Sequence, residues 1–164
     1  MNKEEACILI PTLNEGKTIE GIIKEFKSMG FSDILVIDGH STDGTAEKAK
    51  NAGARIVIQS GSGKGQAVSQ AFQLITSKYI VMIDGDGTYL PEEVDKLLEP
   101  VVSGHADHVI GDRFANYQKG AFTGLNLFGN RILNKMFGLH TAYGLKTYFQ
   151  VTGLLTIMQS NKSN

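Results

Sequence analysis

Two aspartates separated by one glycine, Asp84-Gly85-Asp86, have the clearest chemical potential in this chain. They directly follow the hydrophobic run 79–83, which is typical of a buried strand. Two carboxylates at the end of a strand can share one divalent cation. Mg2+ or Mn2+ held by oxygen ligands commonly bridges the phosphates of a substrate. Because Asp-Gly pairs are also common in turns, the motif alone leaves a metal site and a plain turn equally open.

The elements that would position this motif alternate between strand and helix patterns. Helical spacing of apolar residues marks a helix that ends near Gly30, a helix around 67–75 and a helix opened by Pro91, and Ser41 or Thr42 can cap a fourth. Repeated strand–helix units predict an α/β fold of three layers, with a mostly parallel central sheet. The expected strands are 6–10, 34–37, 55–59, 79–83 and 109–110.

Polar residues follow three of these strands, at 11–15, 38–41 and 84–86. Ligands of parallel α/β sheets bind beyond the carboxyl ends of the strands. We therefore expect the three segments to converge on one edge of the sheet.

Composition limits the classes of function. The 164 residues suit one globular domain, with 41% hydrophobic and 20% charged residues. The net charge of -1 gives no indication of a nucleic-acid-binding surface. Cys7 is the only cysteine, and no apolar run reaches the roughly 20 residues that span a bilayer. The first five residues do not form a signal peptide, which favours a cytoplasmic location.

Six segments follow one another in the chain: 10–15, 36–45, 63–65, 83–86 with 91–92, 111–114 and 130–131. In this order they resemble the motifs of the inverting family 2 glycosyltransferases, and most of all those of the dolichyl-phosphate sugar synthase group. The resemblance extends from about Ala6 to Phe137 and implies a GT-A fold, the Rossmann-like fold of nucleotide-diphospho-sugar transferases, over residues 1–145. It also implies metal-dependent transfer of a sugar from a UDP- or GDP-linked donor to an acceptor, expected to be polyprenyl (dolichyl) phosphate.

The resemblance assigns roles to individual residues. Pro11, Thr12 and Glu15 would line the base and ribose pocket, and Asp38 would accept a hydrogen bond from the base. Asp84, Gly85 and Asp86 would hold the ribose and, through Asp84 and Asp86, the Mg2+ or Mn2+ on the diphosphate. Lys64, Arg113 and Arg131 would offset phosphate charge. The expected catalytic residues are Asp86, Arg113 and Arg131.

Each of these roles has a structural alternative. Pro11-Thr12 could be a plain strand exit, Asp38 a turn residue, and the three basic residues solvated surface groups. Two positions also depart from the family pattern. Gly39 stands where a second Asp is common, and Thr88 stands where a Gln is common, which weakens one potential metal ligand.

The C-terminal segment departs further. The family continues with Asp-x-x-Ser-Gly-(Phe/Tyr)-Arg, whose Asp resembles the base that activates the acceptor. Codons for 146–154, read from the third base of Lys146, can spell that motif. We therefore infer a shift of reading frame between about Gly138 and Lys146, and expect 146–164 to be an out-of-frame, disordered tail. A genuine divergent C-terminus is the alternative.

Three further possibilities stay open. Residues 124–137 combine apolar side chains with Arg131 and Lys135, which suits a helix lying on a membrane or over the acceptor site, or a plain core helix. The chain could also be a catalytically inactive remnant that only binds a nucleotide sugar. A sugar-nucleotide pyrophosphorylase fits less well, because that class usually has a glycine-rich, arginine-containing loop where this chain has 11–15.

Overall fold

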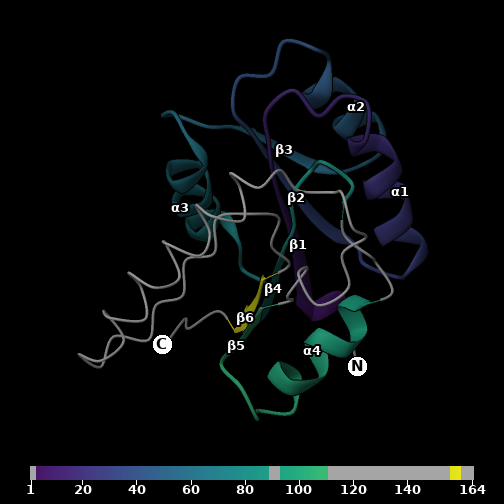
Figure 1. Cartoon of the computed structure of the whole chain (residues 1–164), viewed down its shortest axis with the longest axis vertical. Coiled ribbons are helices and arrows are strands. Elements are labelled where there is room, and N and C mark those ends of the chain that lie inside the picture. The colour runs from purple at the N-terminus through teal and green to yellow at the C-terminus, as the bar shows by residue number, and fades with distance from the viewer. Residues whose placement is uncertain (1–2, 89–92, 111–155, 160–164) are drawn as a thin grey trace, which may run out of the picture. The chain divides into compact units, whose positions relative to one another are not determined.

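The computed structural model of the chain describes residues 3–88, 93–110 and 156–159 (Figure 1). The strands are β1 (Ala6–Thr12), β2 (Asp33–Asp38), β3 (Arg55–Ile58), β4 (Tyr79–Met82), β5 (His108–Ile110) and β6 (Thr156–Gln159). The helices are the 3-10 turn η1 (Lys3–Glu5) and α1 (Ile19–Ser28), α2 (Thr45–Asn51), α3 (Lys64–Leu74) and α4 (Val94–Val102). Gly111–Phe114, Asn130-Arg131, the expected helix at 124–137 and the segment 146–154 lie outside the described residues.

The strands form one sheet in the order β3-β2-β1-β4-β6-β5. Strands β3, β2, β1 and β4 are mutually parallel, and β6 runs antiparallel to both β4 and β5. This arrangement confirms the expected mostly parallel α/β sheet. Thr12 pairs in register with Asp38, so the carboxyl ends of β1 and β2 lie side by side.

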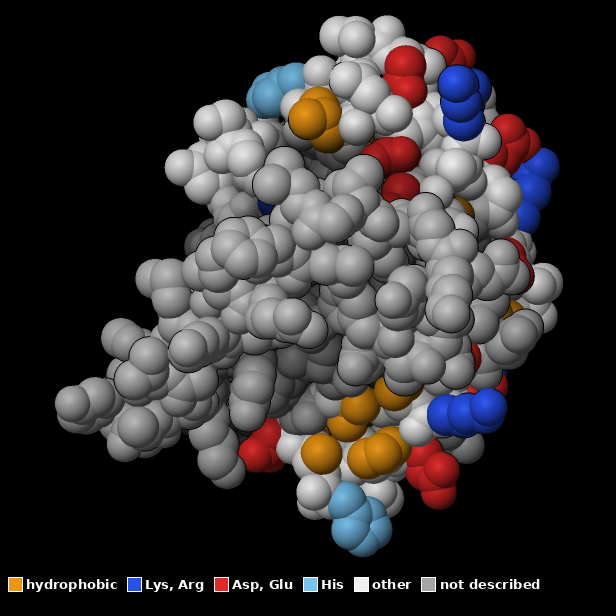
Figure 2. Space-filling view, viewed as in Figure 1, with side chains coloured by type: hydrophobic (Ala, Val, Ile, Leu, Met, Phe, Trp, Pro, Cys, Tyr) orange, Lys and Arg blue, Asp and Glu red, His pale blue; other side chains and the backbone are white. Residues whose placement is uncertain are grey.

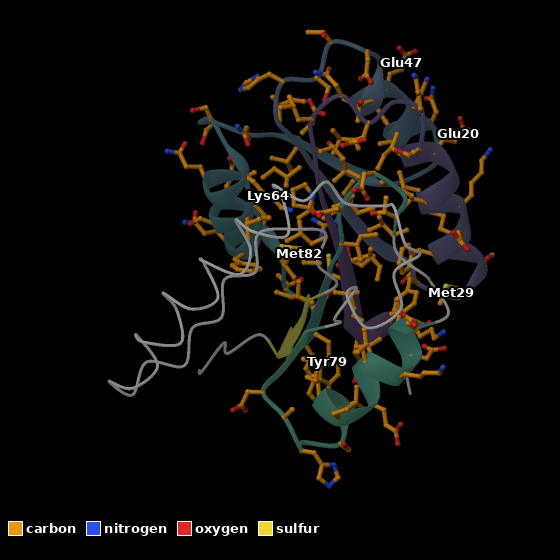
Figure 3. The ribbon with its side chains drawn as sticks, in the orientation of Figure 1. Glu20, Met29, Glu47, Lys64, Tyr79 and Met82 are labelled. Atoms are coloured by element: carbon orange, nitrogen blue, oxygen red, sulfur yellow. The ribbon has the colours of Figure 1, made fainter. Side chains whose placement is uncertain are left out.

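Helices cover both faces of this sheet because β1 is apolar on both sides. Ala6, Ile8 and Ile10 pack in a core with α1, α2 and α4, whereas Cys7 and Leu9 pack in a second core with α3. Figure 1 shows α3 on one side of the sheet and α1 and α2 on the other. Most polar residues of these helices are exposed, as Glu20 and Glu47 are in Figure 3, whereas Thr45 of α2 is buried.

The start of α2 differs from the expectation. We expected Ser41 or Thr42 to cap this helix, but α2 begins at Thr45, after Gly44 in a left-handed conformation. The side chain that accepts the hydrogen bond of the Thr45 backbone N–H is Asp43, at 3.1 Å. Ser41 and Asn14 instead hold the preceding loop, with the Asn14 N–H donating to Ser41 Oγ at 2.8 Å.

The C-terminal strand β6 is a second difference. Residues 156–159 were expected to be disordered, yet they pair along their full length with β4 and continue the ladder to β5. Ladder hydrogen bonds join backbone groups, so a segment can join a sheet edge whatever its side chains were selected for. The expectation of disorder is therefore wrong for these four residues, while the proposed shift of reading frame stays a prediction.

Candidate functional site

The carboxyl ends of β1, β2 and β4 border one pocket of about 310 Å³. In Figure 1, the carboxyl end of β1 points toward the top of the view. Figure 2, drawn in the same orientation, shows acidic side chains near the top of the molecule. The pocket brings together seven of the predicted site residues from three separate segments, 11–15, 64 and 84–86. The residues that line it are Pro11, Thr12, Leu13, Glu15, Gly39, Gln59, Gly63, Lys64, Ala67, Asp84, Gly85 and Asp86.

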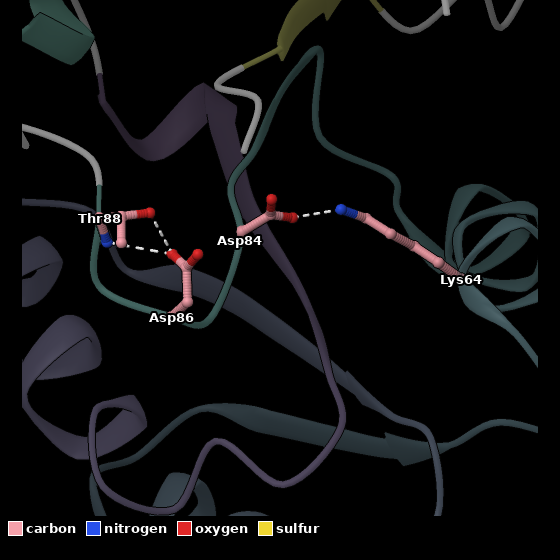
Figure 4. A network of polar contacts seen from close by, with 4 residues as sticks. All are labelled: Lys64, Asp84, Asp86 and Thr88. Carbon is pink, nitrogen blue, oxygen red and sulfur yellow. Dashed lines mark hydrogen bonds and ion pairs between the residues drawn. The ribbon is translucent and has the colours of Figure 1, made fainter. Parts of the chain in front are cut away.

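Lys64 and Asp84 form an ion pair across this pocket (Figure 4). Lys64 is the first residue of α3, which places its ammonium group opposite the end of β4. Asp84 follows that strand, and its side chain is 19% exposed compared with 55% for Lys64. A mobile cation beside a partly buried carboxylate can move to a phosphate when one binds.

Asp86 has a structural contact as well as a place in the pocket. Its Oδ1 accepts hydrogen bonds from the backbone N–H of Thr88, at 3.0 Å, and from the Thr88 hydroxyl (Figure 4). Such hydrogen bonds from an Asp side chain to a residue two positions later are typical of a turn, which was one of the two alternatives for this motif. The turn and the pocket therefore use the same residue, and Asp86 is held in place by its own loop.

Gly85 lies where the pocket wall is closest to β1. A Cβ at this position would stand 3.0 Å from Thr12 Cγ2 and 3.1 Å from Glu15 Cγ. The Thr18 hydroxyl also donates a hydrogen bond to the Gly85 carbonyl oxygen. The segment 84–86 is thus packed tightly on the loop that follows β1.

Negative charge is concentrated at this end of the pocket. Burial raises the pKa of the Glu15 carboxyl above its ordinary value, and Asp86, Asp43 and Asp84 raise it further by repulsion. Because these negatively charged carboxylates repel one another, a cation bound between them would be stabilised electrostatically.

A divalent cation fits these residues only in part. In the described part of the chain, no group of three or more His, Cys, Asp or Glu side chains is arranged to hold a metal ion. Asp84 and Asp86 could supply two oxygen ligands, and Mg2+ usually takes its other ligands from water and substrate phosphates. The donor set therefore suits a metal that arrives with a diphosphate.

Asp38 is buried, with 1% of its surface exposed, and does not line the pocket. Its carboxylate accepts hydrogen bonds from Thr12 Oγ1 at 3.1 Å, from the Ser41 N–H at 2.8 Å and from Ser41 Oγ at 2.6 Å. These contacts make Asp38 a positioning residue that joins the ends of β1 and β2. Its predicted contact with a base stays a prediction.

Sequence reasoning missed Gln59 as a site residue. It directly follows β3, is buried with 4% of its surface exposed, and lines the pocket. The available indication was its place at the end of an expected strand, at the same edge as Asp38 and Asp84. Arg113 and Arg131, two of the three predicted catalytic residues, lie outside the described residues.

Known proteins share this sequence pattern. The family model described as glycosyl transferase family 2 matches residues 7–159. Glycosyltransferase AglJ of Haloferax volcanii is 53% identical over 135 residues, which cover 82% of this chain and 44% of that protein. The chain spans about half the length of several other curated relatives that it matches.

Solved structures share the fold. Glucosyl-3-phosphoglycerate synthase from Mycobacterium tuberculosis, in complex with Mg2+ and uridine diphosphate, matches with a TM-score of 0.54 and 28% identity over 60% of this chain and 39% of that one. The same enzyme with phosphoglyceric acid matches 94% of this chain and 56% of its own, with a TM-score of 0.71 and 22% identity, which supports the fold alone. No described helix is long and apolar enough to cross a membrane.

Proposed function

Because the chain belongs to glycosyl transferase family 2 and has the GT-A fold, we propose that its pocket binds a nucleoside-diphosphate sugar, UDP- or GDP-linked, for transfer of the sugar to an acceptor. The observation that carries this proposal is the convergence of Asp84, Asp86 and Lys64 on one pocket at the carboxyl edge of the sheet. Two carboxylates and one movable cation suit a diphosphate that arrives with a divalent metal.

Different residues of the pocket would contact different parts of the donor. Pro11, Thr12 and Glu15 line the pocket, the latter two close to Gly85, and would contact the base and ribose. Asp84 and Asp86 would hold Mg2+ or Mn2+, and Lys64 would leave Asp84 to contact a phosphate. When bound, the metal would supply Lewis-acid stabilisation of the departing diphosphate. Neutralised carboxylates would also relieve the repulsion that raises the pKa of Glu15.

For the acceptor we propose a polyprenyl (dolichyl) phosphate and transfer with inversion at the sugar carbon. The support is the motif resemblance to dolichyl-phosphate sugar synthases, in the segments from Ala6 to Phe137. A phosphate acceptor is already ionised near neutral pH, so it needs little help from a protein base. Such an acceptor would bring the protein to the cytoplasmic face of a membrane. Arg113 and Arg131 are proposed to offset charge on the reacting phosphates.

The donor site can be tested by titration calorimetry with UDP and GDP, in Mg2+ and again with a chelator. We expect at least one nucleotide to bind in Mg2+ and to bind at least about tenfold more weakly with chelator, since contacts to charged groups contribute about 1.5–3 kcal/mol. Asp86→Asn should weaken binding in Mg2+ similarly. The amide oxygen of the new side chain can still accept both hydrogen bonds from Thr88. The melting temperature of this variant should therefore stay close to that of the wild type.

Asp95→Asn is the matched control. Asp95 lies on α4, is half exposed and pairs with Lys3, outside the pocket. This variant should bind nucleotide like the wild type. Equal affinity with and without chelator would overturn the metal assignment, and no binding of either nucleotide would overturn the donor site.

A further inference from the structure

Gln59 is a buried polar residue in the wall of the proposed donor pocket. It follows β3 directly, and its backbone N–H donates to the Asp38 carbonyl oxygen at 2.9 Å. Only 4% of its surface is exposed, yet it lines the pocket together with Thr12, Leu13 and Gly39. A glutamine in such a place carries two donors and one acceptor that need partners.

One end of the Gln59 amide is fixed by the protein. Its Nε2 donates to the Gly61 carbonyl oxygen at 2.7 Å. Because a carbonyl oxygen can only accept, this contact identifies the nitrogen and so determines which way the amide is turned. Its Oε1 accepts no hydrogen bond from any residue in the described ranges. A buried acceptor without a donor costs free energy, and a ligand that supplies the donor recovers it.

The loop around Gln59 holds this orientation. The Ser60 N–H donates to Gln70 Oε1 at 2.8 Å, and the Ser62 N–H donates to Gln66 Oε1 at 2.9 Å. Both of these glutamines belong to α3, so the loop that carries Gly61 is tied to the helix that begins with Lys64. The amide is therefore preorganised, which reduces the entropy lost when it binds a ligand.

We propose that Gln59 Oε1 accepts a hydrogen bond from a ring N–H of the nucleotide base, and that the pocket thereby selects uracil or guanine over cytosine or adenine. Uracil and guanine carry a ring N–H on their pairing edge, whereas the equivalent nitrogen of neutral cytosine and adenine is an acceptor and would face Oε1 lone pair to lone pair. Leu13, which is 60% exposed at this pocket, offers an apolar surface to the flat side of the base. This inference rests on the proposed donor site.

The test is calorimetry in Mg2+ with UDP, GDP, CDP, ADP and N3-methyluridine diphosphate. The wild type should bind UDP, GDP or both at least about tenfold more tightly than CDP and ADP, because a site built for one hydrogen bond rejects a base that leaves it unpaired. The result for UDP against GDP identifies which of the two bases the pocket takes. If it takes uracil, methylation of N3 should lower the affinity to that of CDP.

A variant of Gln59 and a matched control outside the pocket test the role of this residue in base recognition. Gln59→Met removes the acceptor at similar volume, and should reduce the preference over CDP and ADP to less than about threefold while weak binding of all nucleotides remains. Asp95→Asn changes a side chain on α4 that lies outside both the pocket lining and the Gln59 loop, and should keep the wild-type preference.

Three outcomes would overturn the inference. Equal binding of all five nucleotides by the wild type would leave the donor site standing but remove base selection by Gln59. An equal loss of affinity for every nucleotide in Gln59→Met, with the preference retained, would make the residue merely structural. If no nucleoside diphosphate bound, the proposed function itself would fail. If Gln59→Met does not fold, the comparison of UDP with N3-methyluridine diphosphate on the wild-type protein still tests the inference for a pocket that selects uracil.

Discussion

At the scale of single residues, several predicted ligands of the donor site also make hydrogen bonds or ion pairs with neighbouring protein groups. Asp84 pairs with Lys64, Asp86 accepts from Thr88, and the buried Asp38 accepts from Thr12 and Ser41. Such contacts fix the carboxylates before any ligand arrives, which is a general requirement of a preorganised site. They also explain why a turn and a ligand site were both compatible with the Asp84-Gly85-Asp86 sequence.

The Gly85→Ala substitution tests how closely this loop packs on β1. The new Cβ would stand 3.0 Å from Thr12 Cγ2, so Thr12 or the loop would have to move. We expect a loss of about 1–3 kcal/mol in the free energy of unfolding, typical of overpacking, and weaker nucleotide binding. Urea denaturation and calorimetry measure the two effects.

Gly21→Ala is the control for this substitution. Gly21 lies inside α1, and a Cβ there would meet nothing within 4 Å. Alanine should therefore stabilise the protein by up to about 1 kcal/mol through its helix propensity. A Gly85→Ala protein as stable as the wild type, with unchanged nucleotide affinity, would contradict the close packing described for this loop.

At the scale of elements, the loops after β1 and β2 are joined by side chains. The Gly16 N–H donates to Asp43 Oδ2 at 2.8 Å, and Lys48 Nζ donates to the Gly16 carbonyl oxygen at 2.7 Å. The Thr42 N–H donates to Asn14 Oδ1 at 2.9 Å. Because Glu15 lies between Asn14 and Gly16, these bonds set the position of one wall of the pocket.

Asp43→Asn should loosen this junction. An amide nitrogen at the Oδ2 position would face the Gly16 N–H donor to donor, while the oxygen at Oδ1 could still accept from Thr45. We expect a lower melting temperature at pH 7 and weaker nucleotide binding. Thermal denaturation measured between pH 7 and pH 3 checks the first effect.

The pH dependence has a definite sign. Hydrogen bonds from the Thr45 hydroxyl and then the Gly16 N–H hold the pKa of Asp43 below its ordinary value of 3.8. A carboxylate with a lowered pKa stabilises the fold fully above that ordinary value, and the contribution is lost as the pH falls through the lowered pKa. The difference between the wild type and Asp43→Asn should therefore shrink below about pH 4. A difference that stays constant down to pH 3 would count against the role of the Asp43 charge.

At the scale of the whole described structure, β6 completes the sheet. It lies between β4 and β5, so without it neither strand would have a neighbour on that side in the described structure. An uncovered strand edge exposes unpaired backbone groups and promotes aggregation. We therefore expect β6 to contribute to stability even if its codons are out of frame.

Ile157→Pro tests this contribution. Ile157 pairs with Val81 of β4 and Val109 of β5, and proline would remove its N–H from the ladder. A backbone acceptor left without its ladder hydrogen bond costs about 1–3 kcal/mol, so the melting temperature should fall. Ile157→Val keeps the N–H and should remain close to the wild type. Identical melting curves for Ile157→Pro and the wild type would restore the original expectation of a disordered tail.

The sequence by itself determined the parallel core of the fold and the edge at which the site lies. Short apolar runs and helical patterns identified β1 to β4 and their helices, because burying apolar side chains leaves few alternatives for such segments. Parallel strands joined by helices present their carboxyl ends at one edge, so Pro11, Thr12, Glu15, Asp84 and Asp86 could be grouped before any coordinates. Lys64 was assigned to the same site because segment 63–65 resembles a motif of the family.

Only the tertiary structure decided which polar atoms face the pocket and which face the protein. Asp38 ends β2 and Gln59 follows β3 at the same edge, yet Asp38 is held by Thr12 and Ser41 outside the pocket lining while Gln59 lines the pocket. Hydrogen bonds within each loop, together with the one that Thr12 of β1 donates to Asp38, make that choice, and they leave no periodic pattern to detect. The position of β6 in the sheet could not be predicted from the sequence for a related reason. Its position depends on which backbone edge is uncovered, and the neighbours β4 and β5 are far from it in the chain.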